Sequence, residues 1–159
     1  MGKKISTRAA YGDALAEFGQ NPQIVALDAD VASCTMSEVF ARKYPERFFN
    51  VGIAEANMID MAAGFATTGK IAFCHSFAMF TAGRGYDQIR NSVAYPHLNV
   101  KIIGSHGGLT VGEDGATHQC IEDISLMRTI PGMVVLVPCD GHEAREAVKA
   151  LIDYDGPCF

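Results

Sequence analysis

The sequence contains no apolar run that approaches the roughly 20 residues needed to cross a bilayer. Its first residues include no continuous apolar segment of the kind that directs secretion. The net charge of −5 provides no basic field that would attract nucleic acid or an anionic membrane. We therefore expect a cytoplasmic protein that has neither a nucleic-acid nor a membrane partner.

Cysteine pairs with the spacing CxxC are also missing. The five cysteines are widely spaced: Cys34, Cys74, Cys120, Cys139 and Cys158. Their odd number and their spacing suit reduced thiols better than a disulfide framework or a zinc site. With 48% hydrophobic and 19% charged residues, the chain is long enough to bury a core, and we expect one globular domain over residues 1–159.

Short β-branched runs alternate along the chain with stretches of helical spacing. The runs predict strands at 23–27, 70–74, 100–103 and 133–137, with a weaker one at 47–51. Helices are expected at about 6–19, 54–69, 82–93 and 118–129, and after Asp140. Ser6 or Thr7 can cap the first helix and Asp140 the last. The alternation predicts an α/β fold, a three-layer sandwich with a mainly parallel sheet covered on both faces.

Polar and aromatic candidates follow several of these strands, at the sheet edge where ligands collect in such folds. Glu55 lies in the first turn of a helix, where an acid favours the helix dipole and can simply face water. Phe77 and Phe80, three residues apart, can hold a flat ring or belong to the core. Residues 104–119 contain five glycines, two histidines and two acids, which is typical of a ligand-binding loop or of a solvated surface loop.

Together, the motifs GIAEANM, SFAMF and GSHGGLTVGEDGATHQ closely resemble the pyrimidine-binding domain of transketolases. The resemblance extends from Thr7 and Arg8 to residues 138–141 and so covers nearly the whole chain. GEDGxTHQ is its most specific part, whereas GIAE is shared with related thiamine enzymes. The resemblance implies the pyrimidine-binding fold of thiamine-diphosphate enzymes. It also implies transfer of a two-carbon ketol unit between sugar phosphates in the pentose phosphate pathway.

The resemblance also implies roles toward the cofactor. Glu55 matches the glutamate that hydrogen-bonds N1′ of the aminopyrimidine, which helps the cofactor lose its thiazolium C2 proton and makes this residue catalytic. Phe77 and Phe80 match aromatics that flank the pyrimidine ring. Asp30 matches an acid near the cofactor and the subunit interface. A third family aromatic is replaced here by small residues, for which Tyr86 can partly substitute.

Other residues match the substrate channel of the family. Asp114 matches an acceptor for a sugar hydroxyl, and His118 matches a catalytic proton-transfer group near the cofactor and the donor oxygen. His106, also assigned as catalytic, lies further out, toward the acceptor's phosphate. Arg8 matches an arginine that grips phosphate. Cys34 stands where the family usually has a phosphate-binding serine, and a thiol is a poorer donor, although a neighbouring hydroxyl can replace it.

The GDG motif that holds the diphosphate and its divalent metal in thiamine enzymes is missing. We therefore expect a separate diphosphate-binding chain to hold the Mg or Ca ion. We assign no metal ligand to this chain and expect it to bind only the pyrimidine end of thiamine diphosphate. The start at Met1 favours the second subunit of a split transketolase in a dimeric or heterotetrameric assembly. Small residues between Ala54 and Thr68 suit a close partner surface. The family's third domain would follow Phe159, so the sequence is either trimmed or a fragment.

Two other interpretations remain open. The same half-site can serve a deoxyxylulose-phosphate synthase or a dihydroxyacetone synthase. A non-catalytic binding module that keeps the fold but has lost its partner belongs to a different class.

Overall fold

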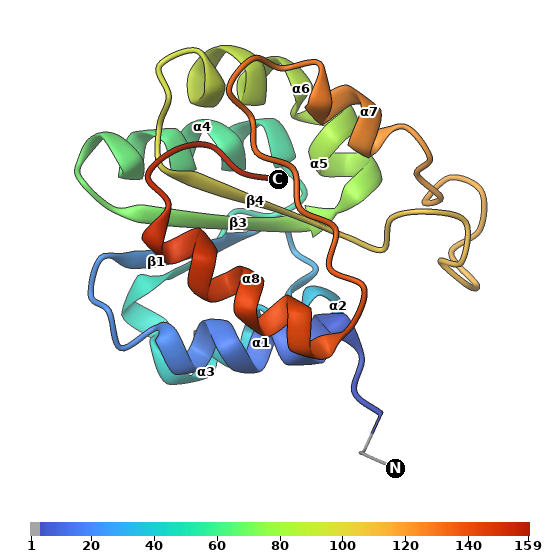
Figure 1. Ribbon diagram of the computed structural model, residues 1–159, viewed down its shortest axis with the longest axis horizontal. Coiled ribbons are helices and arrows are strands. Elements are labelled where there is room, and N and C mark those ends of the chain that lie inside the picture. Colours follow the sequence, from blue (N-terminus) through green and yellow to red (C-terminus); the bar gives the residue numbers. More distant parts are fainter. Residues whose placement is uncertain (1–3) are drawn as a thin grey trace.

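Four parallel strands form the central sheet of the computed structural model, which describes residues 4–159 (Figure 1). They are β1 (Ile24–Asp28), β2 (Phe48–Asn50), β3 (Ile71–Phe77) and β4 (Val100–Ser105), in the order β2-β1-β3-β4. Every residue of β1 is buried, because helices cover both faces of the sheet. Register pairs the last residue of β1, Asp28, with His75 of β3.

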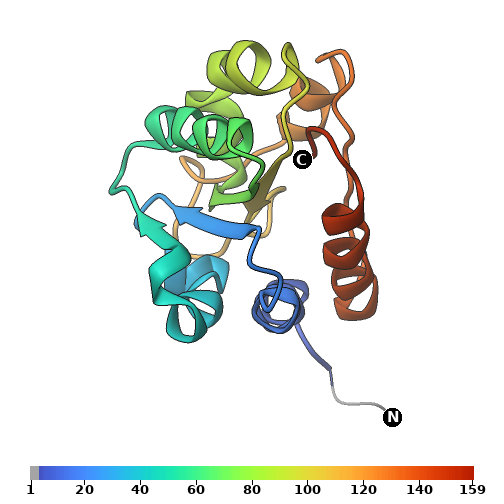
Figure 2. The ribbon, with the colours of Figure 1, turned by 90° about the vertical axis from the view of Figure 1, so that its left-hand side faces the viewer.

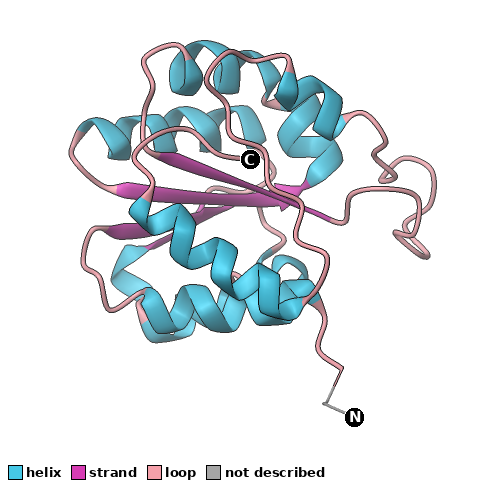
Figure 3. Ribbon diagram, in the orientation of Figure 1, coloured by secondary structure: helices cyan, strands magenta, loops and turns pink. Residues whose placement is uncertain are grey.

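Helices form one layer on each side of the sheet (Figures 1, 2 and 3). One layer contains α1 (Thr7–Phe18), α2 (Ala32–Thr35), α3 (Glu38–Lys43) and α8 (Gly141–Asp153). The other contains α4 (Glu55–Thr67), α5 (Ala78–Arg84), α6 (Tyr86–Gln88), the π-helix η2 (Ile89–Ala94) and α7 (Asp123–Arg128). A 3-10 turn, η1 (Pro45–Arg47), precedes β2. This arrangement confirms the predicted three-layer α/β fold.

Helix caps explain where two of these elements begin. The Ser6 hydroxyl accepts a hydrogen bond from the backbone N–H of Ala9 at 3.3 Å, as expected for the start of α1. The Asp140 carboxylate accepts from the N–H of Glu143 at 2.8 Å, as expected for α8. Both capping predictions are confirmed.

The strand predicted at 133–137 is not one of the strands of the sheet. Val134 makes only an isolated parallel bridge to Cys158, and Cys158 in turn makes an isolated parallel bridge to Lys101 of β4. Its backbone hydrogen bonds join Val134 and Leu136 to Pro157 and Phe159, so the segment is extended but pairs with residues 157–159 and not with a strand of the sheet. Predicted strands 70–74 and 100–103 are correct in place, although β3 and β4 each continue further toward the carboxyl end.

Two helix predictions differ from the structure in length. The helix expected at 118–129 covers only Asp123–Arg128, because the glycine-rich loop continues through bends and turns before it. The helix expected at 82–93 begins earlier, at Ala78, and is interrupted near Gly85 before α6 and η2 continue it. A Cβ at Gly85 would lie 2.9 Å from the Thr81 carbonyl oxygen, so the chain passes too close there for a side chain.

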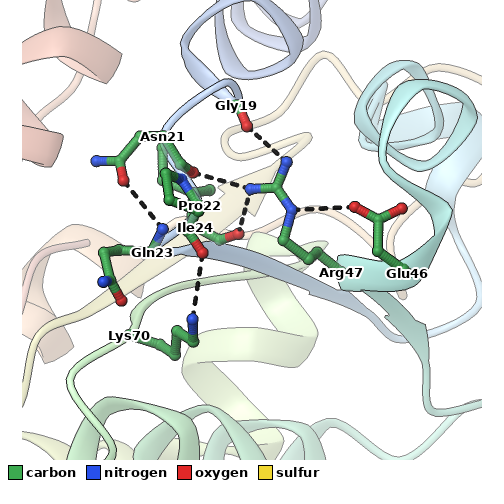
Figure 4. A network of polar contacts seen from close by, with 8 residues as sticks. All are labelled: Gly19, Asn21, Pro22, Gln23, Ile24, Glu46, Arg47 and Lys70. Atoms are coloured by element: carbon green, nitrogen blue, oxygen red, sulfur yellow. Dashed lines mark hydrogen bonds and ion pairs between the residues drawn. The ribbon is translucent and has the colours of Figure 1, made fainter.

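Arg47 and Lys70 tie together the amino ends of the strands, and we call this the amino-end clamp (Figure 4). The Arg47 guanidinium donates to the carbonyl oxygens of Gly19, Asn21 and Ile24 at 2.7–3.0 Å. Lys70, directly before β3, donates to another carbonyl of the same connection at 3.2 Å. The clamp fixes the α1–β1 connection at the opposite end of the sheet from the candidate site.

All five cysteines are free thiols. Burial raises the pKa of the Cys74 thiol well above its ordinary value, so this group stays protonated and packs as a small apolar side chain. None of the helices described within residues 4–159 has both the length and the apolar character that crossing a membrane requires.

Candidate functional site

Glu55 is the first residue of α4, and its side chain is only 4% exposed. Arg84 Nη1 donates to both carboxylate oxygens, at 3.0 and 3.2 Å. A carboxylate at a helix start is favoured by the helix dipole, and a buried one also needs a partner for its charge. The predicted acid is therefore not solvated but held in a paired, nearly buried position.

The two predicted aromatics lie together at the carboxyl end of β3. The ring centroids of Phe77 and Phe80 are 6.1 Å apart with their planes inclined by 26°. The guanidinium carbon of Arg84 lies 4.3 Å from the centroid of Phe80. Residues four apart on a helix share a face, which explains why Arg84 reaches this ring from α5.

The loop between β4 and α7 brings both predicted histidines to these aromatics. This loop extends beyond the end of the sheet (Figure 1). The His118 ring meets Phe80 edge-on at 5.1 Å and Phe77 at 5.7 Å, and the His106 ring lies 4.4 Å from Phe77. Residues far apart in the sequence thus form one cluster at the carboxyl edge of the sheet, where ligands collect in such folds.

The neighbours of His106 determine its protonation. Arg8 Nη1 lies 3.2 Å from its Nε2, and Ser105 Oγ lies 2.7 Å from its Nδ1. Arginine can only donate, so Nε2 accepts and the Nδ1–H donates to Ser105. Burial and the charge of Arg8 lower the pKa of His106, while the charge of Asp114 partly opposes this. His106 is therefore neutral near pH 7.

Arg8 connects the histidine to the start of α2. Its guanidinium donates to the backbone oxygen of Cys34 at 3.3 Å, and the Cys34 thiol lies 4.0 Å from the Ser33 hydroxyl. Asp114 is exposed in the loop, near enough to act on His106 by its charge. Asp30 is exposed and accepts a hydrogen bond from Asn50 at the end of β2. Direct contacts or charge interactions thus connect the predicted site residues other than Asp30, whose side chain bonds Asn50 instead.

A buried polar network below this cluster was missed by the sequence reasoning. The Tyr11 hydroxyl donates to His75 Nε2 at 2.6 Å, and His75 Nδ1–H donates to the Leu27 carbonyl at 2.7 Å. Burial lowers the pKa of His75 and raises that of Tyr11, so both groups are neutral near pH 7. The available signal was a histidine inside an otherwise apolar strand, where it requires hydrogen-bond partners.

Asp28, buried at the end of β1, holds the adjoining turn. Its carboxylate accepts from the backbone N–H of Val31 at 2.6 Å and from the hydroxyls of Thr35 and Ser37, both at 2.8 Å. These bonds order α2 and therefore the backbone of Cys34 that Arg8 contacts.

Arg84 was also missed as a site residue. Its segment was interpreted as small residues, with Tyr86 as a substitute for a third aromatic. Instead, the Tyr86 hydroxyl lies 2.9 Å from Thr129 Oγ1 and its ring packs against the hydrophobic core. The group stacked on Phe80 is the guanidinium of Arg84, and its spacing of four from Phe80 was the signal that could have identified it.

The cluster is suited to binding a flat nitrogen heterocycle. Glu55 offers a buried carboxyl group for a ring nitrogen, and Phe80 offers a face for stacking. Arg8, beside His106, offers N–H donors for an anion. Within residues 4–159, no group of three or more His, Cys, Asp and Glu side chains is arranged to hold a metal ion.

Comparisons with known proteins point to one family. The family model described as "Transketolase, pyrimidine binding domain" matches residues 3–159. The chain is 53% identical over 153 residues to a putative transketolase C-terminal section of Methanocaldococcus jannaschii, covering 96% of this chain and 48% of that protein. It is 46% identical to the 6-deoxy-6-sulfo-D-fructose transketolase subunit SqwH of a Clostridium species, with the same coverage of 96% and 48%.

Solved structures agree with these relatives. A split gene transketolase, described as an inactive beta4 tetramer, superposes with a TM-score of 0.86 at 52% identity, covering 98% of this chain and 50% of that one. The transketolase of Campylobacter jejuni gives a TM-score of 0.90 at 28% identity, covering 99% and 25%. This chain spans about half the length of the first two curated relatives. The chain belongs to the family of transketolase pyrimidine-binding domains.

Proposed function

We propose that this chain supplies the pyrimidine-binding half of a thiamine-diphosphate-dependent transketolase. The observation that carries the proposal is the buried Glu55 carboxylate beside the ring of Phe80, at the edge of the sheet where the family resemblance expects the pyrimidine. Membership of the family supports the cofactor, and the curated relatives that are themselves a C-terminal section and a subunit support a divided enzyme.

The residues of the cluster fit this cofactor. Thiamine diphosphate supplies the nucleophilic carbon that accepts a two-carbon ketol unit. Glu55 holds a proton at N1′ of the pyrimidine, where a buried carboxyl group interacts with little competition from water. Phe80 supports the ring by stacking, and Phe77 backs Phe80 and excludes water. His118, which touches both phenylalanines, moves a proton at the donor's oxygen.

Arg8 and His106 bind the phosphate of the sugar substrates. Burial and, after it, the charge of Arg8 lower the pKa of His106. A phosphate placed between them adds negative charge, which favours protonated His106 and makes its Nε2 a second donor. Asp114 accepts from a sugar hydroxyl at the entrance, and the carbonyl of Cys34 orients Arg8. Asp30 is the acid near the cofactor and the subunit interface in this proposal.

A partner chain holds the diphosphate and its Mg or Ca ion in this proposal. The given sequence lacks the GDG motif for those groups, and the relatives named as a C-terminal section and a subunit support an assembly that is at least dimeric and brings two half-sites together. We assign the complex to the cytoplasm, because free thiols suit a reducing compartment.

Reconstitution tests the proposal. We expect the chain alone to be inactive, and to transfer ketol units from xylulose phosphate to ribose phosphate once a diphosphate-binding chain is added. Glu55→Gln should lower this rate by about 10²–10⁴-fold, because the glutamine cannot exchange a proton with N1′. Asp60→Asn, an exposed acid on the same helix, is the matched control and should change little.

Each outcome is decisive for one part of the proposal. Activity of the isolated chain would refute the divided enzyme, and full activity of Glu55→Gln in the complex would remove Glu55 from its role. Turnover of pyruvate with glyceraldehyde phosphate would favour a deoxyxylulose-phosphate synthase, and formaldehyde as acceptor a dihydroxyacetone synthase. Absence of any complex with a diphosphate-binding chain would favour the non-catalytic module.

A further inference from the structure

The guanidinium of Arg84 makes the two contacts that a bound aminopyrimidine would need. Its Nη1 hydrogen-bonds both oxygens of Glu55 at 3.0 and 3.2 Å. Its central carbon lies 4.3 Å from the centroid of Phe80. No other side chain described in residues 4–159 hydrogen-bonds the Glu55 carboxylate, so Arg84 alone compensates that buried charge.

The chemical similarity between the two groups is close. A guanidinium is flat, carries N–H donors in its plane and stacks on aromatic faces. An aminopyrimidine hydrogen-bonded to Glu55 through a ring nitrogen would also be flat and would stack on the same ring. Because one guanidinium both lies over the Phe80 ring and bonds Glu55, a flat group making the same two contacts would take the same space. The two groups therefore cannot occupy this place together.

We propose that Arg84 is an internal stand-in for the pyrimidine, which closes the site in the free chain and leaves when the cofactor binds. This inference rests on the proposed function. While the site is empty, Arg84 satisfies Glu55, which would otherwise be a buried charge without a partner. Upon binding, the cofactor takes over both contacts and Arg84 turns outward.

The local structure allows this movement. The Arg84 side chain is 54% exposed even in the closed position, so its departure uncovers no core. Gly83 and Gly85 on either side add no side chain that would block its path into solvent. The backbone of α5 can stay in place, because Phe80 remains packed on Phe77. The change is a side-chain rotation rather than a rearrangement of the fold.

The cost of this displacement lowers the apparent affinity for the cofactor. Only the fraction of molecules with Arg84 outside can bind, so the apparent dissociation constant equals the intrinsic one divided by that open fraction. For a partly exposed ion pair with an added stacking contact, removal of Arg84 should tighten binding by about 5- to 30-fold. The variant Arg84→Met keeps an aliphatic side chain of similar length and removes the charged, planar guanidinium.

The chain offers a matched control at a distance from the site. Arg145 on α8 pairs with both oxygens of Glu17 at 2.7 Å, and its guanidinium carbon lies 5.1 Å from the ring centroid of Phe18. Arg145→Met therefore removes the same kind of ion pair and stacking contact without touching Glu55.

Calorimetric titration of thiamine diphosphate with Mg²⁺ into the complex with the diphosphate-binding chain provides the test. We expect Arg84→Met to bind about 5- to 30-fold more tightly than the wild type, and Arg145→Met to bind like the wild type. If the wild type binds the cofactor and Arg84→Met binds it equally well or more weakly, the proposed displacement of Arg84 is wrong and the proposed function is unaffected. No binding by the wild-type complex overturns both.

A second measurement needs neither turnover nor an affinity. The side-chain N–H resonances of Arg84, assigned by their loss in Arg84→Met, should shift in the free chain when Glu55→Gln removes the ion pair. They should shift again when the wild-type complex is saturated with the cofactor. Resonances of Arg84 that stay unchanged on saturation would show that it is not displaced and would overturn the proposal.

Discussion

Tyr11→Phe should destabilise the chain, because it removes the hydroxyl that donates to the buried His75 Nε2 at 2.6 Å. His75 Nδ1–H already donates to the Leu27 carbonyl, so this tautomer leaves Nε2 as an acceptor. His75 is fully buried, and no water can replace the missing donor without entering the core. The variant therefore loses a hydrogen bond and leaves a polar atom unsatisfied.

A buried acceptor without a partner costs about 1–3 kcal/mol of unfolding free energy. For 159 residues, an unfolding entropy of about 2.1 cal/mol/K per residue gives about 0.33 kcal/mol/K, so Tm should fall by about 3–9 °C. Urea unfolding at pH 7.5 measures the same difference at constant temperature. Arg8 lies three residues before Tyr11 on α1, so loosening this bond should also weaken phosphate binding by the reconstituted complex.

Tyr44→Phe is the control for this experiment. The Tyr44 ring packs on Phe40 with centroids 5.1 Å apart and beneath Arg47 at 4.2 Å, but its hydroxyl makes no hydrogen bond within residues 4–159. This variant should stay within about 0.5 kcal/mol of the wild type. If Tyr11→Phe costs no more than Tyr44→Phe, the hydroxyl does not stabilise His75 and the assigned tautomer is wrong.

Two further predictions concern β4. Lys101→Met should cost about 1–3 kcal/mol, because buried Lys101 donates to the carbonyls of Tyr154 and Gly156, both at 2.7 Å. Burial lowers the pKa of Lys101 to about 8. Between pH 8 and about 10.4 the unfolded state binds more protons than the folded state, so the unfolding free energy of the wild type should rise with pH relative to that of Lys101→Met. Urea unfolding at several pH values measures this, and a difference between the two proteins that does not change with pH would contradict it. Gly104→Ala should lower Tm by several degrees, since its Cβ would lie 2.5 Å from the Phe159 ring, and an unchanged Tm would show that the ring can move aside.

The fold was largely predictable because its strands are continuous apolar runs. A strand such as β1 is buried on both faces, so its residues are apolar up to the last one, Asp28. The run at 133–137 has the same composition, but forming a ladder depends on which segment lies beside it. Here that neighbour is the segment 157–159, which is not one of the strands of the sheet, and composition does not carry this information.

The site was predictable in its position and in most of its residues, but not in its contacts. Phe77, Phe80, His106 and His118 lie together because parallel strands end at one edge of the sheet. The partner of Glu55 was missed because a long arginine side chain can reach many acceptors, and only the packing selects one. The roles of these residues toward a cofactor and substrates remain predictions for the reconstituted complex to test.

The amino-end clamp implies that the two ends of the sheet open with different ease. Arg47 holds three carbonyl groups of the α1–β1 connection, so backbone amides of that end should exchange with solvent only when the whole domain unfolds. At the other end, the loop that carries His106 and His118 contains few backbone hydrogen bonds of regular structure. Its amides should exchange through small local openings. The domain can therefore reshape its ligand-binding end around an incoming molecule while the anchored end preserves the register of the strands.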